Sequence, residues 1–224
     1  KMKRAVTLAT QLVENEKNVV IWTVFRHNVE YLCKLFAEIN LDAIGITGAI
    51  PMKTNEEKEI VGRDELINIF KNNKGKILVA TIGSIAESVS LHRNFKGEPV
   101  CQNAIYLERS FNAGQFMQSL FRLYRIGSDP EIPVINTFLM STFANGYTRT
   151  IDDDVNDRLN ERKRRMFDLM DDDGRLTPMD LENEPFTDEN GLAQIYDRNE
   201  DDEIIQRKIL HMIRKHQRNN QDDN

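Results

Sequence analysis

The sequence has little cysteine and no long apolar run, which argues against a disulfide-linked protein and against one that spans a membrane. Its two cysteines, Cys33 and Cys101, have no partner at disulfide or metal-site spacing, so we expect reduced thiols in an intracellular protein, cytoplasmic or, in a eukaryote, nuclear. No stretch of about 18 apolar residues occurs, which argues against a transmembrane helix. The first four residues lead into an amphipathic segment and not into the apolar core of a signal peptide.

Metal-binding patterns are also missing. The histidines are scattered, and only His211 and His216 come near ligand spacing, with no cysteine beside them. The run 171–174, Asp-Asp-Asp-Gly, has the residue types of a calcium loop. An EF-hand with Gly174 in sixth place would, however, need an acid where Leu169 stands. The sequence therefore predicts no metal ligands of its own.

Positive charge is scarce, because 36 acidic residues outnumber 30 basic ones and leave a net charge of −6. The deficit lies near the C-terminus. Residues 151–224 carry 12 Lys and Arg against 21 Asp and Glu, a balance of −9, and residues 1–150 keep +3. A nucleic-acid surface must then be a local patch on the N-terminal part. One hypothesis is that the acidic tail, 171–224, folds over this part as a brake.

What the sequence does contain is a regular alternation of strand-like and helix-like segments. It predicts an α/β domain over 1–150, with a mainly parallel sheet flanked by helices, and a helical, acidic, partly flexible extension over 151–224. In such sheets ligands bind beyond the carboxyl ends of the strands. The predicted strands cover 18–22, 43–47, 76–81, 103–107 and 134–139, and the predicted helices cover 2–16, 29–39, 56–70, 115–126, 151–170 and 202–218.

The most informative segment is the helix-like stretch before Gly127. Gln115, Gln118, Arg122 and Arg125 fall on one helical stripe, and apolar residues fall on the opposite one. Two guanidinium groups one turn apart suit a polyphosphate, because each is planar and permanently charged. The alternative is an ordinary amphipathic helix with solvated arginines.

This segment and its surroundings resemble the last conserved block of superfamily 2 nucleic-acid motors, specifically the Swi/Snf-like branch. That branch has a strand, a Trp-Asn-Pro-like turn and then Gln-x-x-Gly-Arg-x-x-Arg-Ile-Gly-Gln. The turn 111–113, Phe-Asn-Ala, stands where Trp-Asn-Pro would be, while Phe121 and Ser128 replace the usual Gly and the final Gln. The positions that match are Gln118, Arg122, Arg125, Ile126 and Gly127.

A second block of the same branch is similar to residues 76–91. There the strand brings hydroxyls to a phosphate of the bound nucleic acid, and the resemblance assigns this role to Thr81 and Ser84. Residues 88–91, Ser-Val-Ser-Leu, stand where the branch has Gly-Ile-Asn-Leu, and the loss of Gly at Ser88 makes a positive φ costlier. The alternative is a buried strand followed by a small-residue helix cap. The residues to which the resemblance assigns nucleotide contacts are Glu87, Ser88 and Ser90.

Two further turns resemble the backbone-gripping turns of the branch. Residues 19–28 are similar to its strand ending in Phe-Ser-x-Phe, which implies that Thr23, helped by Arg26, touches the nucleic-acid backbone. Thr47 and Gly48 resemble its Thr-Gly turn, whose exposed amides face phosphates without reading bases. For Thr23 the alternative is a cap of the following helix.

Beyond the sheet, residues 150–155, Thr-Ile-Asp-Asp-Asp-Val, resemble a Thr-Ile-Asp-Glu-x-Val segment of the branch, so the resemblance spans about residues 17–170. It implies a RecA-like lobe, the second of a two-lobe ATPase. The sequence has neither a Gly-x-x-x-x-Gly-Lys-Ser/Thr loop nor a strand-terminal Asp-Glu pair. ATP and Mg²⁺ would therefore be held mainly by a missing N-terminal lobe. A chain that starts at Lys1 and not at Met fits a piece cut from a longer protein.

In that lobe Arg122 and Arg125 would act as arginine fingers, and Gln118 would help to position the lobe or a phosphate. The implied partners are the N-terminal lobe and nucleic acid, most of all double-stranded DNA held by its backbone, with no membrane. The alternatives are another superfamily 2 motor lobe, from an RNA helicase or a restriction-system motor, or a non-catalytic module that binds nucleic acid or protein, with Arg122 and Arg125 in salt bridges.

Overall fold

A computed structural model describes residues 1–54, 60–85, 89–124, 132–143 and 148–170. Its strands form one five-stranded, parallel sheet in the order β2-β3-β1-β4-β5. The mainly parallel α/β fold predicted from the alternation is therefore confirmed. The strands are β1 (Asn18–Thr23), β2 (Ala43–Ile46), β3 (Ile77–Thr81), β4 (Cys101–Tyr106) and β5 (Ile135–Phe138). The helices are α1 (Met2–Glu14), α2 (Arg26–Glu38), α3 (Arg63–Asn72), α4 (Ala113–Leu120), α5 (Ile151–Met170) and the 3₁₀ turn η2 (Ile82–Ser84).

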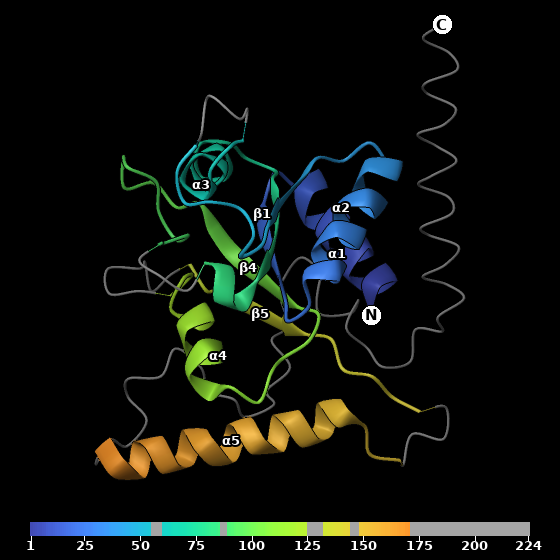
Figure 1. The fold of residues 1–224 in the computed structure, drawn as a ribbon, viewed down its shortest axis with the longest axis vertical. Helices are drawn as coiled ribbons and strands as arrows, with labels where there is room; N and C mark the ends of the chain where they lie inside the picture. Colours follow the sequence, from blue (N-terminus) through green and yellow to red (C-terminus); the bar gives the residue numbers. More distant parts are fainter. Residues whose placement is uncertain (55–59, 86–88, 125–131, 144–147, 171–224) are drawn as a thin grey trace, which may run out of the picture.

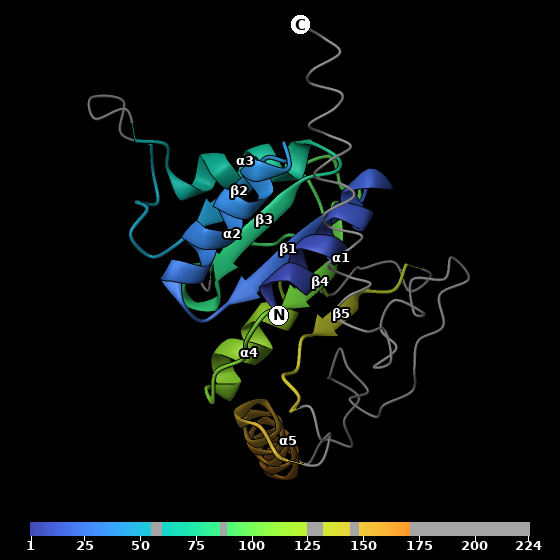
Figure 2. The same ribbon diagram turned by 90° about the vertical axis from the view of Figure 1, so that its right-hand side faces the viewer.

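Helices cover both faces of the sheet, α1 and α2 on one face and α3 and α4 on the other (Figures 1 and 2). The side chains of β1 alternate between the faces, as in any strand. Val20 and Trp22 join the core under α3 and α4, whereas Val19 and Ile21 join the core under α1 and α2. All four are fully buried, which explains why this strand has an unbroken apolar run.

The helix α5 packs against α4 (Figure 1), where Val155 and Leu159 enter the same core as Phe116. Thr150 and Asp153 form a reciprocal cap at its start. The Thr150 amide donates to the Asp153 carboxylate at 2.7 Å, and the Asp153 amide donates to the Thr150 hydroxyl at 3.4 Å. The predicted helix at 151–170 is thus confirmed, while the predicted helix at 202–218 lies outside the described residues.

Two predicted helix boundaries are wrong. The helix predicted to begin at residue 56 begins at Arg63, because Gly62 has an extended backbone (φ −79°, ψ 162°) and serves as the N-cap. The helix α4 ends at Leu120 and does not continue to residue 126. A hydrogen-bonded turn follows it and buries Leu123 in the core, so Arg122 lies in a turn and not on the helical stripe.

Candidate nucleotide and nucleic-acid interface

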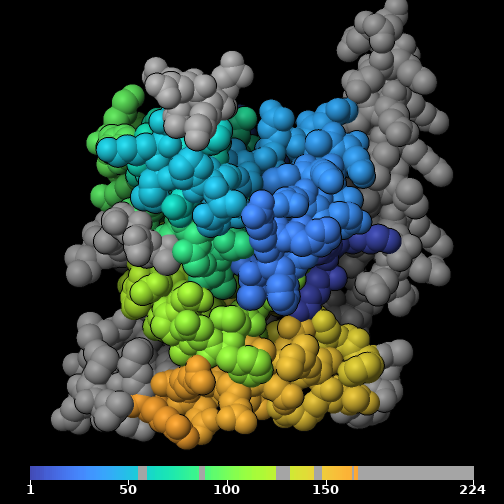
Figure 3. Space-filling model, viewed as in Figure 1, coloured from blue at the N-terminus to red at the C-terminus, as the bar shows by residue number. Residues whose placement is uncertain are grey.

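Residues predicted to bind phosphates follow the carboxyl ends of three neighbouring strands. Thr47 follows β2, Thr81 ends β3 and Thr23 ends β1, and these strands pair in parallel. Because parallel strands end at the same edge, the fold brings the three predicted turns together. Figure 3 shows the turn after β3 reaching the surface directly above α4, and the two elements are in contact.

The side chain of Thr23 is fully buried at this edge. Its hydroxyl donates to Glu108 at 2.6 Å, and Asn28 donates to the other carboxylate oxygen at 2.7 Å. The α2 N-cap residue is Phe25, so Thr23 is not the helix cap. Sequence reasoning missed Glu108 and Asn28, although Glu108 stands just after a buried strand, which was the available signal.

Thr47 and Arg26 line an open hollow of about 460 Å³ between α2 and the end of β2. Thr47 is buried, whereas Gly48 is exposed and Arg26 is exposed and paired with Glu30 at 3.1 Å. Cys33 lies on the same wall, and burial raises the pKa of its thiol to about 11, so it is a poor nucleophile at neutral pH. A ligand in this hollow could meet the backbone amides of the turn at Thr47 and the positive charge of Arg26.

Thr81 and Ser84 lie together in the turn after β3. The Ser84 hydroxyl donates to the Thr81 carbonyl at 2.7 Å and also contacts the Ile46 carbonyl at 3.2 Å, so it joins the ends of β3 and β2. Arg63, on the first turn of α3, donates to the Ser84 carbonyl at 2.6 Å. Sequence reasoning missed Arg63, since nothing in its neighbourhood distinguishes it from an exposed helical arginine.

Arg122 connects the turn after α4 with the segment after β3. Its guanidinium Nη1 donates to the Val89 carbonyl at 3.1 Å, and its own carbonyl accepts a hydrogen bond from the Leu91 amide at 2.9 Å. Gln118 is exposed on α4. The half-buried Ser90 hydroxyl contacts His92. The other predicted nucleotide contacts, Arg125, Glu87 and Ser88, lie outside the described residues.

Arg109 is another residue that sequence reasoning missed. It lies in the connection between β4 and α4 and stacks on the Phe138 ring, with its guanidinium carbon 4.6 Å from the ring centroid. It donates to Asn156 of α5 at 2.8 Å. Burial lowers its pKa from the ordinary arginine value, although nearby Asp152 opposes this shift. Arg109 therefore attaches α5 to the sheet.

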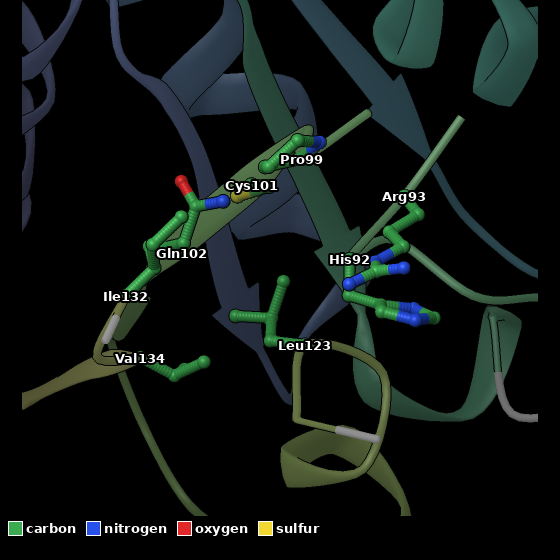
Figure 4. Close-up of a pocket in the computed structure, with 8 residues that line it drawn as sticks. All are labelled: His92, Arg93, Pro99, Cys101, Gln102, Leu123, Ile132 and Val134. Atoms are coloured by element: carbon green, nitrogen blue, oxygen red, sulfur yellow. The ribbon is translucent and has the colours of Figure 1, made fainter. Parts of the chain in front are cut away.

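A small hollow lies between the start of β4 and the turn after α4 (Figure 4). Pro99 and Cys101 face it from one side and Leu123 from another. Its volume of about 20 Å³ has room for about one water molecule and not for a nucleotide. Among the described residues, no group of three His, Cys, Asp or Glu side chains is placed to hold a metal ion, and no helix is long and apolar enough to cross a membrane.

Among known proteins, the chain is similar to proteins of solved structure. No protein-family model matches the chain, and no curated protein does. The chain is similar to the C-terminal part of the Fun30 ATPase domain, at 17% identity over 70% of this chain and 52% of that chain, with a TM-score of 0.46. It is also similar to T4 UvsW, at 15% identity over 75% of this chain and 33% of that chain, with a TM-score of 0.44. The chain thus spans about half of the first protein and a third of the second, and its function is argued below from its own residues.

Proposed function

We propose that this chain is the second RecA-like lobe of an ATP-dependent nucleic-acid translocase of the Swi/Snf-like kind. One observation carries the proposal. The Arg122 turn and the segment 89–91, which resemble two separate blocks of that branch, are joined by two hydrogen bonds. Residues predicted from separate motifs to face one nucleotide thus come from adjoining turns of the fold.

On the nucleotide side, Arg122 and Arg125 act as arginine fingers toward ATP that is held, with Mg²⁺, mainly by another lobe. A guanidinium that reaches the transferring phosphoryl group stabilises its developing negative charge, which can accelerate hydrolysis on the order of 10³–10⁵-fold. Arg122 exchanges its bond with the Val89 carbonyl for a phosphate oxygen when the lobes close. Exposed Gln118, on the preceding helix, helps to orient the same phosphate or the closed lobe.

On the nucleic-acid side, the Thr47–Gly48 turn and the Thr81–Ser84 turn hold the phosphate backbone. Their backbone amides and the half-buried Thr81 hydroxyl bind phosphate without reading bases, so sequence specificity should be low. The buried Ser84 hydroxyl already donates to the Thr81 carbonyl and shapes its turn instead. At the end of β1, buried Thr23 shapes its turn through Glu108, and exposed Arg26 provides the charge. Double-stranded DNA is the expected partner, and alternate closing and opening of two such lobes would move the protein along it.

The test is ATP hydrolysis by the protein that carries this lobe together with its nucleotide-binding lobe, measured without nucleic acid and with double-stranded DNA, single-stranded DNA or RNA. We expect double-stranded DNA to stimulate hydrolysis, and Arg122→Ala and Arg125→Ala each to abolish it while ATP still binds. Arg164→Ala, which removes an exposed arginine of α5, is the matched control and should keep the wild-type rate.

Three other outcomes would redirect the assignment. Stimulation by RNA alone would favour an RNA helicase. Hydrolysis that is indifferent to both arginine substitutions would remove the arginine-finger roles. A protein that binds nucleic acid but never hydrolyses ATP would favour a non-catalytic binding module, in which Arg122 has a structural role through contacts such as its bond to Val89.

A further inference from the structure

The first turn of α3 contacts one of the two turns that are proposed to hold the nucleic-acid backbone, Thr81–Ser84, and the loop that follows the other, Thr47–Gly48. On one side, Arg63 Nη1 donates to the Ser84 carbonyl at 2.6 Å. On the other side, the Arg63 amide donates to the Pro51 carbonyl at 2.9 Å, and the Asp64 amide donates to the Met52 carbonyl at 3.1 Å. The start of this one helix is therefore bonded to the Thr81–Ser84 turn and to residues 51–52, in the loop that follows the Thr47–Gly48 turn.

The start of α3 packs so closely on residues 51–54 that no side chain fits at Gly62, its N-cap residue. The Gly62 amide donates to the Thr54 hydroxyl at 3.0 Å. A Cβ atom added at Gly62 would lie 2.3 Å from the Lys53 carbonyl carbon and 2.7 Å from the Met52 carbonyl oxygen. Side chains never approach backbone this closely, so only glycine allows the loop after β2 to pack directly on the start of α3.

The start of α3 is also bonded directly to the turn after β3, and that turn is bonded to the end of β2. The Ser84 hydroxyl bonds the Thr81 and Ile46 carbonyls, and Ile46 immediately precedes Thr47. The Ser84 carbonyl then accepts from Arg63, so the bonds close a ring: the end of β2, the loop after it, the start of α3, the turn after β3 and back to β2.

Arg63 also borders an open hollow of about 200 Å³ that Met52, Gly83 and Val89 help to line. Its Nε is buried and has no hydrogen-bond partner among the described residues. A half-buried guanidinium with an unpaired donor is costly. The planar group nevertheless holds one carbonyl in a defined direction, which a flexible ammonium would do less well.

We infer that Arg63 is a positioning residue that holds the Thr47–Gly48 turn and the Thr81–Ser84 turn at a fixed spacing. This inference rests on the proposed function and goes beyond it, since it gives Arg63 the role of spacing the two turns and not of contacting a phosphate. With the spacing set, both turns engage phosphates of the same strand at once. Without Arg63 each turn still exists, but the two no longer fit one backbone together.

The experiment measures binding of the 224-residue chain to a fluorescein-labelled DNA duplex over a series of salt concentrations. Arg63→Met removes the donors and keeps an apolar stem, whereas Arg63→Lys restores the charge and a donor group without the planar geometry. Lys74→Met is the matched control. Lys74 is exposed and precedes the amino-terminal end of β3, away from the Thr81–Ser84 turn, and its replacement by Met removes the same single positive charge. Circular dichroism and thermal unfolding confirm that each variant is folded.

We expect Arg63→Met to bind roughly tenfold more weakly, Arg63→Lys to lie between it and wild type, and Lys74→Met to bind like wild type. The decisive readout is the slope of log affinity against log salt, which counts neutralised phosphates. A positioning residue leaves this slope unchanged, because only uncharged contacts are lost.

A slope that falls by about one in Arg63→Met would overturn the inference, since Arg63 would then contact a phosphate directly. Equal affinities of Arg63→Met and wild type would overturn it as well. If Arg63→Met does not fold, Arg63→Lys decides: wild-type affinity in that folded variant would show that the directed planar group is dispensable. Failure of the wild-type chain to bind any duplex would instead count against the proposed function.

Discussion

The hydroxyl of Thr23 lies 2.6 Å from Glu108 and donates a hydrogen bond to its carboxylate, which joins the ends of β1 and β4. The same carboxylate accepts from Asn28 at 2.7 Å and from the Val24 amide at 3.3 Å. Glu108 therefore orders the turn between β1 and α2, which carries Arg26. Thr23, which the sequence predicts to touch the nucleic-acid backbone, is thus a buried residue that orders the start of α2 through Glu108.

Replacing Thr23 by Val keeps the shape of the side chain and removes the hydroxyl. We expect the free energy of unfolding to fall by about 1–3 kcal/mol, because a partly buried carboxylate loses a donor. Urea unfolding followed by circular dichroism measures the change. Thr23→Ser keeps the hydroxyl and loses only a methyl group. A Val variant as stable as the Ser variant would show that the bond to Glu108 contributes nothing.

Substituting Gly62 by Ala should destabilise the protein, because the new Cβ would meet the Lys53 carbonyl carbon at 2.3 Å. Such overpacking costs about 1–3 kcal/mol, and here the obstacle is backbone that cannot move aside cheaply. Gly48→Ala is the matched control, since a Cβ there would meet nothing within 4 Å. Thermal unfolding of both variants is the measurement, and equal melting temperatures would contradict the packing argument.

The stability of the fold should depend on pH through Asp152. Burial acts to raise the pKa of this carboxyl, but hydrogen bonds from Lys1 and the Ser141 amide outweigh it, so the pKa lies below the ordinary value of 3.8. A carboxyl whose pKa is lower in the folded state contributes stability above its unfolded pKa and loses it as pH falls through the folded pKa. The contribution should therefore be complete at neutral pH and fade below about pH 4.

Asp152→Asn checks this dependence. We expect the variant to be less stable than wild type at neutral pH, and the difference to shrink as the pH is lowered below about 4. Urea unfolding midpoints across this range are the measurement. A difference that stays constant down to the acid-unfolding limit would mean that the Lys1 and Ser141 contacts do not act through the ionised carboxylate.

Local pattern was enough to find the strands and most helices. The strand β1 reads as a continuous apolar run because both of its faces are covered, and such burial leaves a clear trace in the sequence. The helix boundaries were less well predicted. Periodicity extended α4 to residue 126, yet burial of Leu123 and the bond of Arg122 to Val89 favour a turn after Leu120.

The candidate site was found in part, and the missing parts share one property. Glu108 is 85 positions from Thr23, and Arg63 is 21 positions from Ser84. Neither pair can be recognised from a short stretch of sequence. Each forms only because the order of the strands in the sheet brings distant segments together. The predicted turns were recognisable from short motifs, whereas the groups that hold those turns in place were not.

By itself, the sequence determined the alternation of buried strands and amphipathic helices, the separation of charge along the chain, and the motifs that follow the strands. These are properties of neighbours within a few residues, where periodicity and side-chain type decide the outcome. The tertiary structure alone decided the strand order β2-β3-β1-β4-β5 and the end of α4. It also decided which polar groups meet, because hydrogen bonds and burial between distant segments exist only once the sheet has assembled.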